Sequence, residues 1–501
     1  MLYKLFTRRS LFFYLCSAIL LLVIGVIPYL YFSYFPKAFL HLSPDKEIMP
    51  LSLLRVKIVL LTVAIIGALM ALFLLVPLKW IKKIETFLVP KNQTRFVLSI
   101  FILAFGLRLI WILSTPDVLV SDSGWYCNAA HLLASEGRYA DEDDQNKATA
   151  YLPIGYPLFL SMIFRLTGQS HFMGKFGQVI LSLLLAYLGY RMSLKLGTRK
   201  SANLVLILTA FFPSQIFFTR LFLSEILFTF FFMLFLYLLL LLDEVKKKFI
   251  LLLIAGILLG MATLTRTLTL LFPLVVLIYF IRLKQSSTKA IGRVVLIIIG
   301  MLLLLSPWMI RNKKIMSYGV ISTNGGIDLW VGNNPFANGS FNWPSVTPFD
   351  TSSDEKSADK LGFKLGIEYI KDDPFRFILR GIKKEIFLFA GDLYPLYWDL
   401  IRTAGSRELS PYLALALISQ IYYSLIFLLF LLGIFIYLFK KPAFDLRWSL
   451  LFYTLVYWCG VHFIFFGEDR FHFPIIPIIV MFAAVFAKHL HETMGCNYSH
   501  S

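Results

Sequence analysis

The chain carries little charge for its length. Of its 501 residues only 15% are Asp, Glu, Lys or Arg, whereas 58% are hydrophobic. Soluble globular domains average about 25% charged and about 45–50% apolar residues. The hydrophobic excess comes in blocks close to the ~20 residues that a helix needs to cross a bilayer. The composition therefore excludes a soluble globular protein and predicts a polytopic membrane protein whose first apolar block is a retained helix rather than a cleaved signal peptide.

Cysteine is scarce as well, and the four cysteines (Cys16, Cys127, Cys459 and Cys496) are scattered along the chain. No CxxC pair and no Cys/His pair with zinc spacing occurs, so neither a disulfide framework nor a metal site is predicted. Walker A, GxSxG and HExxH motifs are missing, as is a GxGxxG strand–helix unit. No cofactor is predicted, and participation of a divalent cation is left open.

Positive charge is abundant, with a formal net charge of +19. In a soluble protein this excess would suggest nucleic acid as a partner. No basic helix with base-reading side chains stands out here, so nucleic acid is not predicted. Lys and Arg are instead expected in cytoplasmic loops, where they set the orientation of membrane helices.

Apolar blocks predict about twelve membrane spans, with boundaries uncertain by about 2–4 residues. They lie near residues 11–35, 56–78, 96–113, 176–194, 202–218, 223–242, 249–265, 268–281, 292–310, 412–439, 448–466 and 473–489. The block at 268–281 is short for a span, and we expect Arg266 or Arg282 to reach the interface from its ends.

Basic residues cluster before the first span and after every second span, as in Lys246, Lys247 and Lys248 after the sixth. By the positive-inside rule these loops and both termini are cytoplasmic. The alternate loops are then extracytoplasmic. The chain is predicted to divide into five parts. Residues 1–95 hold two additional N-terminal spans, and residues 96–310 form a transmembrane core with a first outer loop at 114–175. Residues 311–411 form an extracytoplasmic subdomain, residues 412–490 hold the C-terminal spans, and residues 491–501 are a cytoplasmic tail.

The segment Tyr151–Gly168, "YLPIGYPLFLSMIFRLTG", is apolar on average but too short for a span and interrupted by Pro153, Gly155 and Pro157. We expect an amphipathic helix in the outer interface, with Tyr151 and Tyr156 at headgroup depth. If this segment crossed the membrane, all later basic loops would face outward, which the positive-inside rule argues against.

Ionisable residues recur at the predicted outer ends of the spans: Asp122, Arg220, Glu225, Arg266, Arg470 and His472. Such residues at membrane depth are costly and usually functional. Simpler roles remain open for each: Asp122 as the start of a helix, Glu225 as the ion-pair partner of Arg220, and Arg266 or Arg470 as headgroup anchors. Taken together they suit an anionic lipid-linked donor, because a carboxylate can act as general base and arginines can hold a phosphate.

The order of several segments resembles the bacterial branch of the dolichyl-phosphate-mannose–protein mannosyltransferase family, which includes the lipid A aminoarabinose transferases. The resemblance covers roughly residues 96–490. The segments are "SDSGWYCNAAHLLASEG", "YLPIGYPLFLS", "SEILFTFFFML", "GMATLTRTLTLLFPLV", "PWMIRNKKIMSYGVISTNGGIDLWVGNNPFANG" and "EDRFHFPIIPII".

The resemblance implies an all-α GT-C membrane glycosyltransferase with interface helices in its first outer loop. Such an enzyme moves a sugar from a polyprenyl-phosphate donor to a protein, lipid or glycan acceptor at the outer face of the cytoplasmic membrane, with inversion. Asp122 matches the family's general base and Glu225 its second acid, where many members carry Asp. Arg266 and Arg470 match positions expected to contact the donor phosphate. His472, Tyr151, Tyr156 and Arg220 complete the expected substrate-binding set.

The chain departs from the family at two places. Two predicted spans, within residues 11–78, precede the family's first helix, and the "PPGYP" motif common in relatives reads "LPIGYP" here. Neither change removes a proposed reacting group. The sugar and the acceptor are not identified by the sequence.

The segment 321–339 is rich in Asn and Gly, which is typical of turns in an outer subdomain. The alternative is sugar or acceptor contact through Asn324, Asn333 and Asn334, with Trp330 stacking on a sugar. Two other functions also stay open: a multi-span transporter or flippase, and an O-antigen ligase or polymerase. Transporters favour internal repeats and midplane polar sites, neither of which is evident here.

Overall fold

The computed structural model describes residues 83, 86–114, 119, 121–140, 147–350, 352, 354–399, 409–439 and 444–495. The two additional N-terminal spans predicted within residues 11–78, the acidic run Asp141–Asp144 and the tail residues 496–501 lie outside the described residues.

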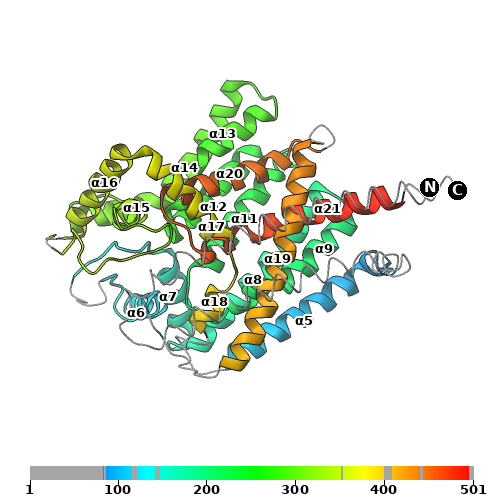
Figure 1. Cartoon of the computed structure of the whole chain (residues 1–501), viewed down its shortest axis with the longest axis horizontal. Coiled ribbons are helices and arrows are strands. Elements are labelled where there is room, and N and C mark those ends of the chain that lie inside the picture. Colours follow the sequence, from blue (N-terminus) through cyan, green and yellow to red (C-terminus); the bar gives the residue numbers. More distant parts are fainter. Residues whose placement is uncertain are drawn as a thin grey trace.

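The described chain is built from helices (Figure 1), and its one β-bridge pairs Ala140 with Ala148. The helices are α5 (Gln93–Leu113), α6 (Asp122–Ser135), α7 (Gly155–Thr167), α8 (His171–Leu196), α9 (Arg199–Ala210), α10 (Pro213–Phe217), α11 (Glu225–Leu240), α12 (Lys248–Thr265), η2 (Thr267–Thr269), α13 (Phe272–Arg282), α14 (Ser287–Met316), α15 (Gly325–Asn333), α16 (Glu355–Asp372), α17 (Pro374–Phe389), α18 (Tyr394–Leu396), α19 (Leu409–Phe439), α20 (Trp448–Ile464), η5 (Asp469–Ile475) and α21 (Ile476–Gly495).

Within the described ranges, 6 helices are long and apolar enough to cross a membrane. They are Gln93–Leu113, His171–Leu196, Lys248–Thr265, Ser287–Met316, Ala414–Phe439 and Asp469–Ala487; shorter apolar helices cover Glu225–Leu240, Thr267–Arg282 and Trp448–Ile464. The predicted all-helical, multi-span membrane fold is confirmed, whereas the count of twelve spans is not. The predicted span at 202–218 is divided into α9 and α10, because Pro213 begins a new helix.

Close helix packing depends on glycines in the segment "GILLGMATLTR". α12 packs against α14, and a Cβ added to Gly256 would lie 2.2 Å from the carbonyl oxygen of Ile297. The reciprocal Cβ on Gly300 would lie 2.3 Å from the carbonyl oxygen of Leu253. Any side chain at either position would force the helices apart, so these glycines serve close packing of α12 on α14.

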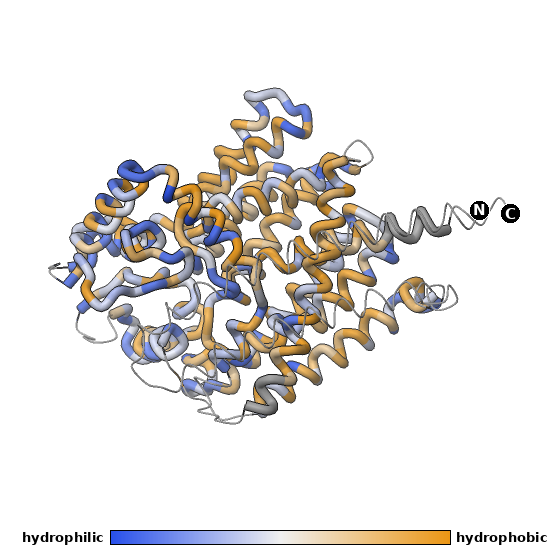
Figure 2. The backbone as a smooth tube through the Cα atoms, in the orientation of Figure 1, coloured by the Kyte–Doolittle hydropathy of each residue, from blue (hydrophilic) through white to orange (hydrophobic). Residues whose placement is uncertain are grey.

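Hydrophilic residues gather at one end of the bundle. Figure 2 shows them around α6, α15 and α16, while the packed helices α8, α11, α12 and α21 are mainly hydrophobic. α14 continues beyond residue 310 to Met316 and reaches this polar end. Arg311, near its last turns, donates to the carbonyl oxygens of Tyr139 and Thr149, each at 2.8 Å. The first loop predicted to be outside is thereby fastened to the bundle.

The segment 151–168 forms a short helix, α7, of 13 residues, which is too short to span a bilayer. Leu158, Met162 and Leu166 are exposed on one face, while Leu160 and Phe164 are buried against the core on the other. This two-sided pattern agrees with the predicted amphipathic helix.

Candidate active site

The first element of the site is an ion pair between Asp122 and Arg470. Asp122 is the first residue of α6, and Arg470 lies in η5. Arg470 Nη1 lies 2.8 Å from Asp122 Oδ2 and also 2.8 Å from the hydroxyl of Tyr394, and its Nε lies 3.4 Å from Glu468. The Asp122 side chain remains 43% exposed, which leaves part of its carboxylate accessible to a substrate.

The backbone before Asp122 is held in an unusual conformation. Ser121 has a φ of 53°, in the left-handed region that non-glycine residues seldom adopt. Such a conformation costs about 1–3 kcal/mol and persists only where the surroundings enforce it. It sets the direction in which α6 begins, and therefore the direction of the Asp122 carboxylate.

The second element is an ion pair between Glu225 and Arg266, which lie 2.8 Å apart. Glu225 begins α11 and is 1% exposed, and Arg266 follows directly after α12. The start of α7 supports this corner, since a Cβ on Gly155 would lie 2.7 Å from the carbonyl oxygen of Leu264. The "LPIGYP" segment therefore packs against the turn that carries Arg266.

The aromatic ring of Phe471 joins the two ion pairs. Its centroid lies 5.2 Å from the guanidinium carbon of Arg266 and 4.8 Å from that of Arg470. Both distances are within the ~6 Å of a cation–π contact. Two acids and two arginines from four separate segments thus form one cluster around a single ring, which we call the carboxylate–arginine cluster (Asp122, Glu225, Arg266 and Arg470).

Two further carboxyl groups lie within electrostatic reach of this cluster and were not predicted as site residues. Burial raises the pKa of Asp328 to about 7, an effect opposed by Arg470 and Arg266. Burial likewise raises the pKa of Glu468 to about 7, again against Arg470. Carboxyl groups that titrate near neutrality are suited to proton transfer. For Asp328, the available signal in the sequence was a lone acid in the apolar stretch "GGIDLWV". That stretch was interpreted as part of a turn-rich segment.

Arg220 forms a buried ion pair with Asp399, whereas Glu225, the partner that the sequence left open for it, pairs with Arg266. Tyr151 is 37% exposed and lies within electrostatic reach of Asp328 and Asp122. Tyr156 is fully buried, and its hydroxyl donates to Gln178 at 3.0 Å. The interfacial position expected for Tyr156 is therefore corrected: its hydroxyl has a partner in the core and needs no contact with water.

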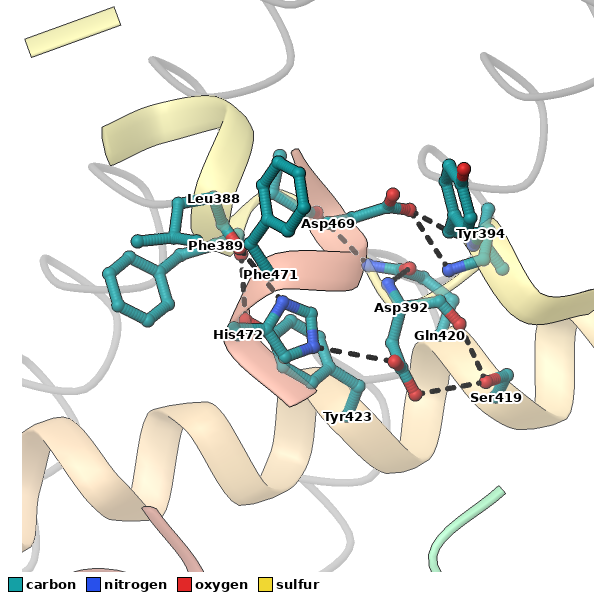
Figure 3. A network of polar contacts seen from close by, with 12 residues as sticks. Leu388, Phe389, Asp392, Tyr394, Ser419, Gln420, Tyr423, Asp469, Phe471 and His472 are labelled. Atoms are coloured by element: carbon teal, nitrogen blue, oxygen red, sulfur yellow. Dashed lines mark hydrogen bonds and ion pairs between the residues drawn. The ribbon is translucent and has the colours of Figure 1, made fainter. Parts of the chain in front are cut away.

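His472 is placed in the interior, beneath the cluster. Its Nε2 lies 3.3 Å from Asp392 Oδ1, its Nδ1 lies 2.8 Å from the carbonyl oxygen of Leu388, and its ring stacks on Tyr423 (Figure 3). Asp469 accepts hydrogen bonds from the backbone N–H groups of Leu393 and Tyr394. These contacts hold η5, and with it Arg470, against the segment that carries Tyr394.

The asparagines and the tryptophan of segment 321–339 make contacts within the protein. Asn324 donates to Asp328 at 3.0 Å, whereas Asn333 is buried and accepts from Lys384 Nζ at 2.9 Å. Asn334 is buried and donates to the carbonyl oxygen of Trp330 at 3.1 Å. Trp330 itself is 4% exposed and packs against Trp343 and Phe349. Only Asn324 adjoins the cluster, through Asp328.

Glu355, the first residue of α16, connects the first predicted outer loop to segment 321–339. Its carboxylate accepts from Thr149 Oγ1 at 2.5 Å, from the backbone N–H of Ala150 at 3.1 Å and from Thr323 Oγ1 at 2.6 Å. Because charge-assisted hydrogen bonds are roughly twice as strong as neutral ones, this residue holds Tyr151 and Asp328 on their respective segments close to Asp122.

Residues 152–310 match the model of the dolichyl-phosphate-mannose-protein mannosyltransferase family. This match confirms the family resemblance that the sequence predicts. The residues matched by the mannosyltransferase model include Glu225 and Arg266 of the carboxylate–arginine cluster, whereas Asp122 and Arg470 lie on either side of them. No curated protein sequence matches the chain.

Solved structures of membrane transferases are similar to this chain at low identity. An oligosaccharyltransferase from Archaeoglobus fulgidus, in complex with zinc and sulfate, has 13% identity and a TM-score of 0.46. The aligned region covers 79% of this chain and 49% of the oligosaccharyltransferase chain. The Archaeoglobus fulgidus oligosaccharyltransferase AglB, in complex with an inhibitory peptide and a dolichol-phosphate, has 11% identity and a TM-score of 0.47, covering 82% and 52%. ArnT from Cupriavidus metallidurans, bound to undecaprenyl phosphate, has 14% identity and a TM-score of 0.40, covering 81% and 78%. The chain thus spans about half the length of the two archaeal structures.

Proposed function

We propose that the chain is a membrane glycosyltransferase that transfers a sugar from a polyprenyl-phosphate donor to an acceptor outside the cytoplasm, with inversion at the anomeric carbon. The observation that carries this proposal is the carboxylate–arginine cluster. A partly exposed carboxylate, Asp122, stands beside a guanidinium, Arg470, which is linked through Phe471 to a second guanidinium, Arg266. The family match over residues 152–310 supports the same chemistry.

Each group in the cluster then has one task. Asp122 accepts the proton of the acceptor hydroxyl or amine as that atom attacks the anomeric carbon. The bond from this carbon to the phosphate oxygen breaks, and the polyprenyl phosphate leaves with the bonding electron pair. Arg470 and Arg266 stabilise the negative charge that grows on the phosphate. Glu225 holds Arg266 in place, because a buried guanidinium without a counter-charge would be costly.

The Asp122–Arg470 pair also makes binding of the donor part of the catalytic cycle. The donor is a phosphodiester whose two free oxygens share one negative charge and offer a bidentate partner to a guanidinium, and it competes with the single carboxylate oxygen that now accepts from Arg470 Nη1. When the phosphate takes Arg470, Asp122 is released to accept a proton from the acceptor. Donor binding therefore precedes activation of the acceptor.

The same cluster favours this function over a transporter. Transporters favour polar sites in broken helices near the midplane. Here Asp122 and Glu225 begin α6 and α11 and are connected through Arg470, Phe471 and Arg266. A pyrophosphate-linked donor, as an O-antigen ligase uses, stays the alternative within the class. The extracytoplasmic side of the site and the cytoplasmic termini rest on the positive-inside distribution of Lys and Arg.

The test is to incubate the purified protein with a panel of polyprenyl-phosphate and polyprenyl-pyrophosphate sugars and follow release of the lipid phosphate. Asp122→Asn should remove sugar transfer while the protein stays folded. Glu136→Gln is the matched control, because Glu136 lies just beyond the same helix in an exposed pair with Arg138. Substantial turnover by Asp122→Asn would show that Asp122 is not the general base. Lipid release from pyrophosphate donors alone would show that the donor is a polyprenyl-pyrophosphate sugar.

A further inference from the structure

Cys127, His131 and His171 come together beside the candidate active site. Cys127 and His131 are four residues apart on α6 and so share one face of the helix, and His171 is the first residue of α8. Cys127 Sγ lies 3.4 Å from His171 Nε2, and His131 Nε2 lies 3.2 Å from the same nitrogen. All three ligand atoms lie within 4.8 Å of one another. The sequence predicts no metal site from its cysteines, so the structure brings together a set that chain spacing conceals.

The two separations that involve His171 are close to those that a tetrahedral metal ion imposes on its ligands. Zinc binds imidazole nitrogen at about 2.0–2.1 Å and thiolate sulfur at about 2.3 Å. At tetrahedral angles, two such nitrogens are about 3.3 Å apart and a nitrogen and a sulfur about 3.5 Å apart. The observed 3.2 Å and 3.4 Å match both edges. The ligand types also match, since one thiolate and two imidazoles suit a borderline-soft divalent ion.

In this arrangement two side chains compete for hydrogen bonding to one ring nitrogen. The Nε2 atom of His171 has two partners at contact distance, Cys127 and His131. A ring nitrogen carries either one N–H or one in-plane lone pair, so it makes one good hydrogen bond. An ion placed between the three ligands accepts a lone pair from each of them and removes the competition.

We propose that Cys127, His131 and His171 form a binding site for a divalent cation of the zinc class that clamps α6 to the start of α8. The ring of His131 stacks on Phe164 of α7, with centroids 4.5 Å apart, so the site lies where these three helices meet. Asp122 begins the same helix, five residues before Cys127. The ion positions α6, and hence Asp122, and the fourth coordination position is left for water. The proposal is independent of the proposed sugar transfer.

Metal binding is measured on the purified full-length chain after chelation. Addition of Zn²⁺ should give one tightly bound ion per chain, and Co²⁺ in its place should give visible d–d bands and a thiolate-to-cobalt charge-transfer band. Cys127→Ser should lose the charge-transfer band, and its affinity for the metal ion should fall by at least about tenfold. Loss of even a second-shell partner of a metal ligand typically lowers metal affinity by about 10–100-fold. Cys459→Ser is the matched control, because Cys459 lies in α20 and should leave both signals unchanged.

A ligand exchange separates loss of the site from loss of folding. His131→Cys keeps three ligands and should retain Co²⁺ while strengthening the charge-transfer band, because two thiolates then bind the ion. In chelator, wild type and Cys127→Ser should unfold at similar temperatures, and Zn²⁺ should raise that temperature in wild type only. A folded wild-type protein that binds no stoichiometric Zn²⁺, or whose binding survives Cys127→Ser, would overturn the proposal.

Discussion

Arg470 donates a 2.8 Å hydrogen bond to Asp122 across 348 positions of sequence. The same nitrogen contacts the hydroxyl of Tyr394, and the guanidinium lies over the ring of Phe471. One side chain thus connects the start of α6, the segment before α19 and the turn before α21. This relationship makes Arg470 the residue on which the geometry of the candidate site depends most.

Arg470→Lys should lower kcat/KM for sugar transfer by about 10²-fold, the usual effect of removing one charge-stabilising donor. An ammonium cannot reproduce the planar donor fork that a guanidinium offers to a phosphate. Steady-state kinetics with varied donor measures the effect. Arg138→Lys is the control, because Arg138 pairs with Glu136 on the surface, with side chains 47% exposed. Equal rates for wild type and Arg470→Lys would exclude Arg470 from catalysis.

Arg266→Ala should destabilise the protein by about 3–5 kcal/mol, because it leaves the Glu225 carboxylate buried without its counter-ion. The double variant Glu225→Gln/Arg266→Met should recover at least half of this loss, since no buried charge remains. Unfolding in detergent of wild type, Glu225→Gln, Arg266→Met and the double variant forms a double-mutant cycle and gives the coupling energy. Additive effects of the two substitutions would show that the pair does not interact.

Arg266→Ala should also raise KM for the polyprenyl-phosphate donor more than KM for the acceptor, because Arg266 is assigned to the donor phosphate. Measurement at a temperature where the variant stays folded separates this effect from instability. Unchanged donor kinetics would leave Arg266 with a structural role only.

His472→Ala should reduce stability by about 1–3 kcal/mol, since it leaves the buried carboxylate of Asp392 with only the Ser419 hydroxyl, at 3.3 Å, of the two side chains that now contact it. Its position within η5, where it is 0% exposed, assigns it to positioning of Arg470 rather than to the donor phosphate. We therefore expect kcat to fall while donor KM stays within about twofold of wild type. A large rise in donor KM with unchanged stability would instead support the direct donor contact that the sequence predicts.

Asp328 should make stability depend on pH. Burial raises the pKa of its carboxyl to about 7 in the folded chain, whereas an exposed Asp titrates near about 3.9. The folded state therefore holds more protons than the unfolded state between these values, and its stability falls as pH rises through that window. Asp328→Asn should flatten the decline in unfolding temperature between pH 5 and about 7. The control Asp372→Asn, at the end of α16, should not, and an identical slope in Asp328→Asn would contradict the assignment.

The helices and their membrane character were accessible from the sequence, because apolar block length is a local property. α8, α12, α14 and α20 fall close to the predicted blocks, and the short, proline-bearing α7 was recognised by its length. The break between α9 and α10 was missed, since a proline at the start of a helix leaves the apolar average of 202–218 unchanged.

The membership of the candidate site was only partly accessible. Asp122, Glu225, Arg266 and Arg470 stand out because charge at the end of an apolar block is rare and costly. Their pairing was not accessible from the sequence, because Glu225 has Arg220 nearby in sequence and yet pairs with Arg266. Proximity along the chain favours the first partner, but packing of α11 on α12 decides for the second.

By itself, the sequence determined that this chain forms apolar helices, which segments are polar, and which isolated charges are worth attention. Tertiary structure alone decided that Phe471 joins two ion pairs, that Asp328 adjoins them, that His472 is buried and that Cys127 lies beside His171. The physical reason is range. Hydropathy acts through solvent on each segment separately, whereas ion pairs, ring contacts and metal ligands act over a few ångströms between residues that only the packed helices bring together.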